Sequence, residues 1–213
     1  QATTYNVAAQ DGSSVTMSAD NLTLNGGSRG INVSNGTVTA TASNNMNISA
    51  SNYGVLSMSG GTVDLSAGNL NVSAAGGALW AHSGDMSVDV NNLTARSDVY
   101  TLLVQNGKTF DIDVDNNMVV SANNGSAIYT YGGNLDVRTG NLNVSSSYQD
   151  TSANQNSPMG AVSMSGENAN MSIIATGDIN IAATGDAQAV IAQGTGTNTQ
   201  SGHMILSAQN INL

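Results

Sequence analysis

The sequence repeats itself at intervals of 23 to 25 residues, and this period constrains the fold more than any other feature. Pairs of apolar residues separated by one residue recur at this spacing. The first series of pairs begins at Val15, Val38, Val63, Met86, Phe110 and Leu135 and resumes after longer gaps at Met171 and Met204. The second series begins at Leu22, Met46, Leu70, Leu93, Met118, Leu142, Ile179 and Ile211. A period of this length predicts a solenoid, in which each repeat packs only against its neighbours.

A third, looser series of apolar residues completes each repeat. Its members are Ile31 with Val33, Val55 or Leu56 with Met58, Leu79, Leu102 with Val104, Ile128, Val162 with Met164, and Val190. In all three segments apolar and polar residues alternate, and Gly, Asn, Asp and Ser separate the segments, which is typical of short strands between turns. We therefore expect an all-β fold: a right-handed parallel β-helix, or three-sided β-solenoid, with about seven or eight coils of roughly 24 residues.

The residue before the second strand of each coil is an Asx residue. The column consists of Asn21, Asn45, Asn69, Asn92, Asn117, Asn141, Asp178 and Asn210. Stacked asparagines can pass amide hydrogen bonds from one side chain to the next, and Asx residues also suit turns. The alternative is that asparagine is merely a common turn residue in this chain, but periodicity of apolar residues alone does not generate such a column. We expect an asparagine ladder at one corner of the solenoid.

The composition fits a thin core that is repeated many times. Only 39% of the 213 residues are hydrophobic, yet they are spaced too regularly for a disordered chain. The net charge of −10, from 14 acids against four bases, disfavours binding to nucleic acid. The chain has no cysteine, which excludes disulfides and thiol chemistry. No apolar run approaches the roughly 20 residues of a membrane-spanning helix, so we expect no membrane insertion by this segment.

Three segments carry a resemblance to a known class of proteins. The sequences NLNVSAAGG, GNLNVSSS and GDINIAATGD begin at Asn69, Gly140 and Gly177. They resemble the passenger domains of Gram-negative autotransporter adhesins and of the related filamentous-haemagglutinin-like exoproteins, and the resemblance covers nearly the whole chain. It implies a solenoid on the bacterial cell surface, held by an outer-membrane anchor beyond this segment, that adheres to a copy of itself on a neighbouring cell or to a host protein or glycan. These families differ in ligand, and viral tailspikes and surface-layer solenoids are the alternatives.

We expect residues 1–213 to form a single solenoid segment of a longer passenger, because the sequence ends directly on a strand without an evident cap. Two insertions interrupt the repeat, near 145–160 and 192–203. Tyr148 and Asp150 lie in the first insertion and are candidate binding residues, since loops that interrupt a solenoid often carry its function. Equally, both insertions could be tolerated surface loops.

Aromatic residues gather on the third strand. Trp80, Tyr129 and Tyr131, together with His82 and Leu103, should lie on outward positions in three successive coils. An exposed aromatic shelf of this kind could stack on sugar rings or anchor a protein partner. The alternative is that these side chains cover one another down the column and stiffen the sheet.

The first strand carries acids on its outward positions. One outward column reads Thr39, Asp64, Ser87, Asp111 and Asp136, and the next reads Thr41, Ser66, Asp89, Asp113 and Arg138. Such a face could hold cations or meet a basic partner, but carboxylates one coil apart repel, which favours a solvated face. The run from Asp111 to Asp115 lacks the glycine and the terminal glutamate of a calcium loop, and we expect no metal site.

Catalysis is not expected. Solenoid enzymes that cleave polysaccharides need clustered carboxylates with basic residues in a groove, whereas this chain has four bases, two histidines and a single glutamate, Glu167. We expect no enzyme activity and no cofactor. The favoured function is adhesion through the polar surface of the rod. The alternatives are a glycan- or matrix-protein-binding module that uses the aromatic shelf and the loop, a passive stalk and, last, a polysaccharide-degrading enzyme.

Overall fold

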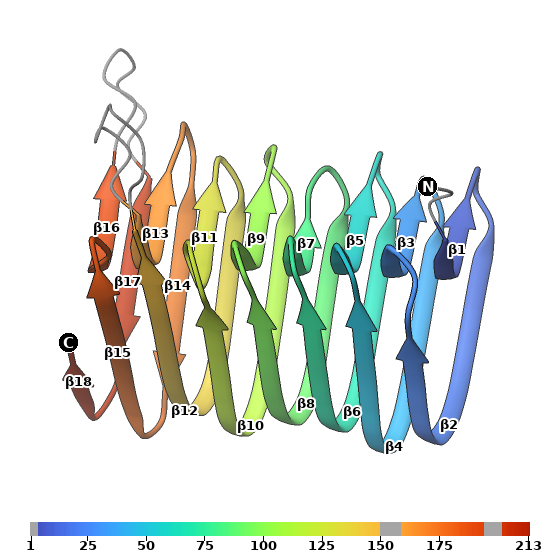
Figure 1. The fold of residues 1–213 in the computed structure, drawn as a ribbon, viewed down its shortest axis with the longest axis horizontal. Coiled ribbons are helices and arrows are strands. Elements are labelled where there is room, and N and C mark those ends of the chain that lie inside the picture. The colour runs from blue at the N-terminus through green and yellow to red at the C-terminus, as the bar shows by residue number, and fades with distance from the viewer. Residues whose placement is uncertain (1–3, 150–158, 194–201) are drawn as a thin grey trace.

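The computed structural model describes residues 4–149, 159–193 and 202–213. These residues form β-strands and no helix, and so no helix long and apolar enough to cross a membrane. Strands of successive repeats stack side by side along one axis, so that the described chain forms a rod (Figure 1). Equivalent residues in neighbouring coils lie about one period apart in sequence, as Asn21 and Asn45 do at a separation of 24. The predicted β-solenoid is confirmed.

Two parallel sheets build the rod. The short sheet contains, in spatial order, β1 (Tyr5–Gln10), β3 (Arg29–Ser34), β5 (Tyr53–Met58), β7 (Gly77–Ala81), β9 (Tyr100–Gln105), β11 (Ile128–Tyr131), β13 (Gly160–Ser165) and β16 (Gln188–Gln193). The long sheet contains β2 (Ser14–Asn25), β4 (Thr37–Ala50), β6 (Thr62–Ala74), β8 (Asp85–Ser97), β10 (Thr109–Ala122), β12 (Asn134–Tyr148), β14 (Asn170–Ala175), β15 (Asp178–Gly185), β17 (His203–Ser207) and β18 (Asn210–Asn212). Each coil contributes one strand to the short sheet, which gives eight coils.

The long-sheet strands differ from the expectation of three separate strands per coil. From β2 to β12 the first and second predicted strands are one continuous strand, which bends just before the Asx column. The pairing register shifts at this bend, for example between Ala42 and Asn45. We call the part before the bend the first leg and the part after it the second leg. In the last two coils the legs are separate strands, β14 with β15 and β17 with β18.

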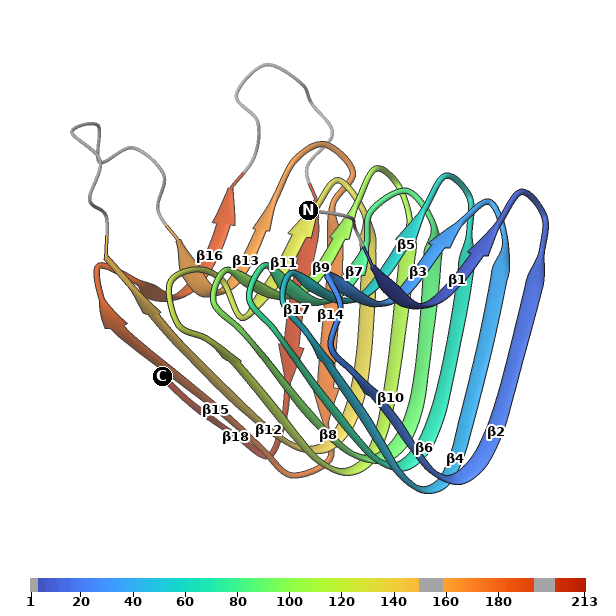
Figure 2. The ribbon, with the colours of Figure 1, turned by 45° about the vertical axis from the view of Figure 1, so that its right-hand side comes forward.

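The two legs and the short sheet enclose a three-sided space (Figure 2). Inward side chains fill it as columns of like residues. Val38, Val63, Met86, Phe110, Leu135 and Met171 form one such column and are at most 3% exposed. Because parallel pairing places equivalent residues over each other, each apolar residue is covered by the apolar residue of the next coil. A thin core therefore suffices to bury these side chains.

The Asx column forms the predicted asparagine ladder. The Nδ2 of Asn45 donates to the Oδ1 of Asn21 at 2.9 Å, and Asn69 donates to Asn45 in the same way at 3.1 Å. Asn92 donates to Asn69 at 3.0 Å and Asn141 donates to Asn117 at 3.3 Å. Between Asn92 and Asn117 the backbone N–H of Asn117 donates to the Oδ1 of Asn92 at 3.3 Å. In every one of these pairs the donor lies one coil after the acceptor, so the ladder has a single direction.

Asp178 occupies the ladder position without an amide donor. Its backbone N–H donates to the Oδ1 of Asn141 at 3.1 Å, and its carboxylate accepts from the Nδ2 of Asn210 at 2.7 Å. The backbone thus replaces the missing side-chain donor. An aspartate is therefore compatible with the ladder at this position.

Replacing Asn69 with Ala should lower the free energy of unfolding by about 1–2 kcal/mol, because it removes one hydrogen bond to Asn45 and one from Asn92. Urea unfolding followed by far-UV circular dichroism measures the effect. The matched control is Ser73→Ala, which changes an exposed residue of the same strand. A loss no larger than that of the control would contradict a stabilising ladder.

Candidate functional site

Three outward surfaces are available for function, because the inward positions of each coil are filled by the core. They are the outer surfaces of the short sheet, of the first legs and of the second legs (Figure 2). Each carries a different kind of side chain.

The outer surface of the short sheet carries most of the aromatic residues. We call it the aromatic face, and it consists of Tyr5, Arg29, Tyr53, Trp80, His82, Tyr100, Tyr129 and Tyr131. At its first coils Arg29 lies between two rings: its guanidinium carbon is 5.5 Å from the ring centre of Tyr5 and 5.6 Å from that of Tyr53. The Nη1 of Arg29 also donates a 2.5 Å hydrogen bond to the Oδ1 of Asn32. Arg29 is thus fixed by cation–π contacts and by one amide.

Trp80 continues this stack where the column of Tyr5, Arg29 and Tyr53 is interrupted by Gly77. Its ring centre lies 4.9 Å from that of Tyr53 in an edge-on arrangement and 5.3 Å from that of His82. The Nε1 donates to the Oε1 of Gln105 at 3.2 Å. Because Gly77 has no side chain, the neighbouring indole can close the gap that it leaves. Trp80 therefore holds the stack together with packing and a hydrogen bond.

Three tyrosines form the rest of the aromatic face. The ring centres of Tyr100 and Tyr129 lie 5.5 Å apart and stack, and those of Tyr129 and Tyr131 lie 6.3 Å apart. The hydroxyl of Tyr129 shares a 2.7 Å hydrogen bond with that of Ser165. Burial, and to a lesser extent the neighbouring Tyr129 and Tyr148, raises the pKa of the Tyr100 hydroxyl. Tyr129, like Trp80, thus uses its polar group within the chain.

The predicted shelf is brought together, but it is less open than expected. Trp80, His82 and Tyr129 are only partly exposed, because each of them is half-buried and lies in contact with other rings. Tyr131 is 46% exposed. The expectation that Leu103 is exposed was wrong. It lies on the outward column between Trp80 and Tyr129, yet it is only 2% exposed, because large neighbours on the same column cover a smaller side chain.

The loop candidates fall at the edge of the described chain. Tyr148 is half-buried at the end of β12, in register with Gly185. Asp150 lies outside the described residues, as do residues 150–158 and 194–201, which make up most of the two predicted insertions. The binding roles predicted for Tyr148 and Asp150 stay predictions.

Sequence reasoning missed the part of the aromatic face that lies in the first coils. Tyr5, Arg29 and Tyr53 follow one another at intervals of 24 residues, and this spacing was the available signal. The third strand was the least regular of the three, so its first residue in each coil was not aligned. Once these first residues are aligned, the position of Arg29 between the rings of Tyr5 and Tyr53 can be predicted.

The outer surface of the first legs carries acids, and we call it the acidic face. Its acids are Asp64, Asp85, Asp89, Asp111, Asp113 and Asp136. The two predicted outward columns are confirmed by the register. Two bases lie among the acids, with the Nζ of Lys108 3.6 Å from the Oδ2 of Asp85 and the Nη2 of Arg138 2.6 Å from the Oδ2 of Asp136.

The run from Asp111 to Asp115 is part of strand β10 and not a loop. Ile112 and Val114 point inward and are each 1% exposed, whereas the aspartates alternate with them on the outside. Partial burial raises the pKa of the Asp111 carboxyl, and the carboxylates of Asp136 and Asp85 add to the rise, which Arg138 opposes. The ionised form of Asp111 is therefore disfavoured in the folded protein.

The outer surface of the second legs carries amides and hydroxyls, and we call it the amide face. One of its columns contains Thr23, Asn47, Asn71, Thr94, Val119, Asn143, Asn180 and Asn212. The next contains Asn25, Ser49, Ser73, Arg96, Ser121, Ser145 and Ala182. Side-chain amides bond between coils here too, as from the Nδ2 of Asn71 to the Oδ1 of Asn47 at 3.0 Å.

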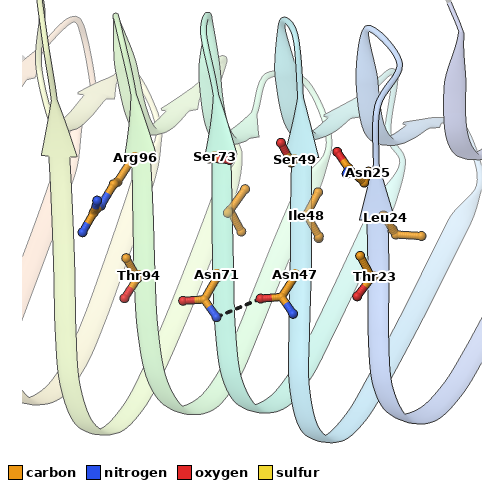
Figure 3. Close-up of a pocket in the computed structure, with 11 residues that line it drawn as sticks. Thr23, Leu24, Asn25, Asn47, Ile48, Ser49, Asn71, Ser73, Thr94 and Arg96 are labelled. Atoms are coloured by element: carbon orange, nitrogen blue, oxygen red, sulfur yellow. Dashed lines mark hydrogen bonds between the residues drawn. The ribbon is translucent and has the colours of Figure 1, made fainter.

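A shallow groove runs over the amide face across strands β2, β4, β6 and β8 (Figure 3). It has a volume of about 460 Å³. Its polar lining comprises Thr23, Asn25, Asn47, Ser49, Asn71, Ser73, Thr94 and Arg96. The described lining residues include no acid, in contrast to the acidic face of the same coils. The groove offers donors and acceptors in rows, together with one positive charge.

Comparison with protein-family models, with curated proteins and with solved structures finds no match for this chain.

Replacing Trp80 with Ala should lower the free energy of unfolding by about 2 kcal/mol, because it removes two ring contacts and the bond to Gln105 and uncovers Gly77. Tyr131→Ala, at an exposed ring of the same face, should cost less than about 1 kcal/mol. Urea unfolding of both variants measures the difference. Equal losses would show that the rings do not form a stabilising stack.

Replacing Asp111 with Asn should raise the stability of the protein slightly at pH 7, because it removes a carboxylate whose ionised form is disfavoured first by partial burial and then by repulsion from carboxylates in adjacent coils. The raised pKa sets the sign: protonated Asp111 is favoured in the folded state, so the wild type loses stability as pH rises through that pKa. The advantage of the variant should disappear below the ordinary aspartate pKa. Urea midpoints between pH 3 and pH 7 test this.

Arg138→Gln should change the stability at pH 7 in the opposite direction, because the charge of Arg138 lowers the pKa of Asp111 and so favours its ionised form. This variant should be less stable than the wild type at pH 7. A pH-independent difference in either variant would contradict the assignment.

Proposed function

We propose that this chain is an adhesive segment of a bacterial surface protein, and that its amide face binds the amide face of a copy on a neighbouring cell. The observation that carries the proposal is the continuity of the amide face through the eight coils. Its first column presents amides and hydroxyls in register from Thr23 to Asn212 in every coil except that of Val119, and its second column is interrupted only by Arg96 as far as Ser145. The resemblance to autotransporter and filamentous-haemagglutinin-like adhesins supports the same function and an extracellular location.

The chemistry of amides and hydroxyls suits self-association. Each of these groups both donates and accepts hydrogen bonds, so a surface rich in them is complementary to itself. A single hydrogen bond across such an interface contributes only about 0.5–1.5 kcal/mol net, but rows of them act together and multiply between cells that carry many rods. The proposed role requires no catalytic step.

The composition of the amide face also keeps like charges apart on contact. The acids of the first legs lie on a different side of the coil, so two amide faces can meet without bringing the acidic faces together (Figure 2). Screening at physiological ionic strength, with a Debye length of about 8 Å, weakens the remaining repulsion between rods. The proposal therefore tolerates the net charge of −10.

Beads coated with the wild-type protein should clump, and the triple variant Ser49→Asp, Ser73→Asp, Ser121→Asp should abolish clumping. These exposed or half-buried hydroxyls lie in one column of the amide face, and aspartates there repel the facing copy. The readout is light scattering of the bead suspension, with far-UV circular dichroism to verify that each variant is folded.

The matched control is the triple variant Ser18→Asp, Thr41→Asp, Ser66→Asp, which adds the same charge to one exposed column of the first legs. It should still clump. Loss of clumping in both triple variants would mean that net charge and not the amide face controls association. Absence of clumping by the wild type would refute self-association and favour a passive stalk.

A further inference from the structure

We propose that the groove on the amide face binds a linear polysaccharide that carries carboxylate groups, with its chain along the rod and one carboxylate on Arg96. This ligand goes beyond self-association and does not depend on it. The inference starts from the distribution of the four basic residues.

Three of the four bases are engaged within the chain. Arg29 lies between two tyrosine rings, Lys108 lies 3.6 Å from Asp85, and Arg138 lies 2.6 Å from Asp136. Arg96 is exposed and makes no hydrogen bond, ion pair or ring contact with the described part of the chain. Asp98, two residues further on, lines a neighbouring hollow with Arg96, but its carboxylate accepts from the Nδ2 of Asn123 at 2.8 Å and forms no ion pair with Arg96. Arg96 is available to an outside anion.

Arg96 lies in the groove and not on an isolated part of the surface. It is in register with Ser73 and Ser121, and Figure 3 shows it at the end of the row that also includes Ser49 and Ser73. A guanidinium binds carboxylates through paired hydrogen bonds. The residues that line the groove itself include Arg96 and no acid, and Asp98, which follows the second leg of β8, lines the neighbouring hollow, so the lining carries one positive charge although the whole chain is negative.

The lining also includes Leu24, Ile48 and Val72, and its polar side chains match sugar hydroxyls. The bond from Asn71 to Asn47 uses one donor of the first amide and one acceptor position of the second, so both amides keep further hydrogen-bonding capacity. That bond also fixes the orientation of the two amides before a ligand arrives, which lowers the entropic cost of binding. Hydroxyls of Thr23 and Thr94 stand at the two ends of the same row.

The geometry favours a linear, periodic ligand. The groove crosses four stacked strands, and stacked strands repeat at about 4.8 Å along the rod. A chain of similar units laid along the rod therefore meets a similar polar group at each coil. Nucleic acid is also linear, but its dense phosphate charge is disfavoured by a protein with a net charge of −10. A carboxylated glycan carries less charge and more hydroxyls.

Isothermal titration calorimetry with oligomers of polygalacturonate, alginate and hyaluronan tests the inference on the wild-type protein. At least one of them should bind, and raising the salt concentration should weaken the binding. Arg96→Gln should weaken it at least tenfold, whereas Arg138→Gln, which removes a base from the acidic face, should not. For polygalacturonate, the methyl-esterified oligomer should lose a comparable factor. Equal affinity of wild type and Arg96→Gln, or no binding of any of the three, would overturn the inference.

A second pair of variants tests the position of the ligand without a change of charge. Ser73→Trp fills the groove and should abolish binding, while Ser66→Trp places the same side chain on the first leg of the same strand and should leave binding intact. Binding that survives Ser73→Trp would place the glycan elsewhere and overturn the assignment. If the wild-type protein makes beads clump but binds none of the glycans, this inference is refuted and the proposed function stands. If it binds a glycan but does not make beads clump, the proposed function is refuted and this inference stands.

Discussion

The stacking of equivalent residues directly over one another is the constraint on which the whole structure depends. Parallel pairing makes the nearest neighbours of a residue those one period before and after it, as Leu65 lies between Ala40 and Val88. On such a lattice a residue must be compatible with its equivalents in the neighbouring coils. Apolar residues satisfy this by burial and amides satisfy it by hydrogen bonds. Stacked carboxylates repel: serine separates Asp64 from Asp111, but Asp111 pairs directly with Asp136, and this contact contributes to the raised pKa of Asp111.

The same constraint distributes chemistry over the three outer surfaces. A residue type that works in one coil tends to recur in the next, so each surface acquires its own character. Rings and a single guanidinium gather on the short sheet, acids on the first legs, and amides with hydroxyls on the second legs. On the aromatic face the rings pack against one another, whereas the amide face keeps hydrogen-bonding capacity for other molecules. This difference is the reason for placing recognition on the amide face.

Much of the fold could be predicted from the sequence because periodicity reports directly on stacking. The three series of apolar residues gave the coil, and the Asx column gave the ladder, including its continuation through Asp178. The bend that joins the two legs into one strand could not be predicted, since turn-forming residues at a corner do not reveal whether pairing continues through it. The alternation of apolar and polar residues assigned Leu103 correctly to an outward position. It carries no information on whether neighbours in the same column bury that side chain. Arg96 drew no attention in the sequence, because its place in the groove and its lack of an ion pair are seen only in three dimensions.

The direction of the asparagine ladder has a consequence for the length of the rod. Every side-chain donor in the ladder points to the preceding coil, from Asn45 onward to Asn210, so each rung needs only one partner of the same kind on either side. Removing or duplicating one whole coil would leave every remaining rung with an equivalent partner. The corner is therefore modular, and a gene can change the reach of the protein by gaining or losing single repeats without a new kind of hydrogen bond at this corner.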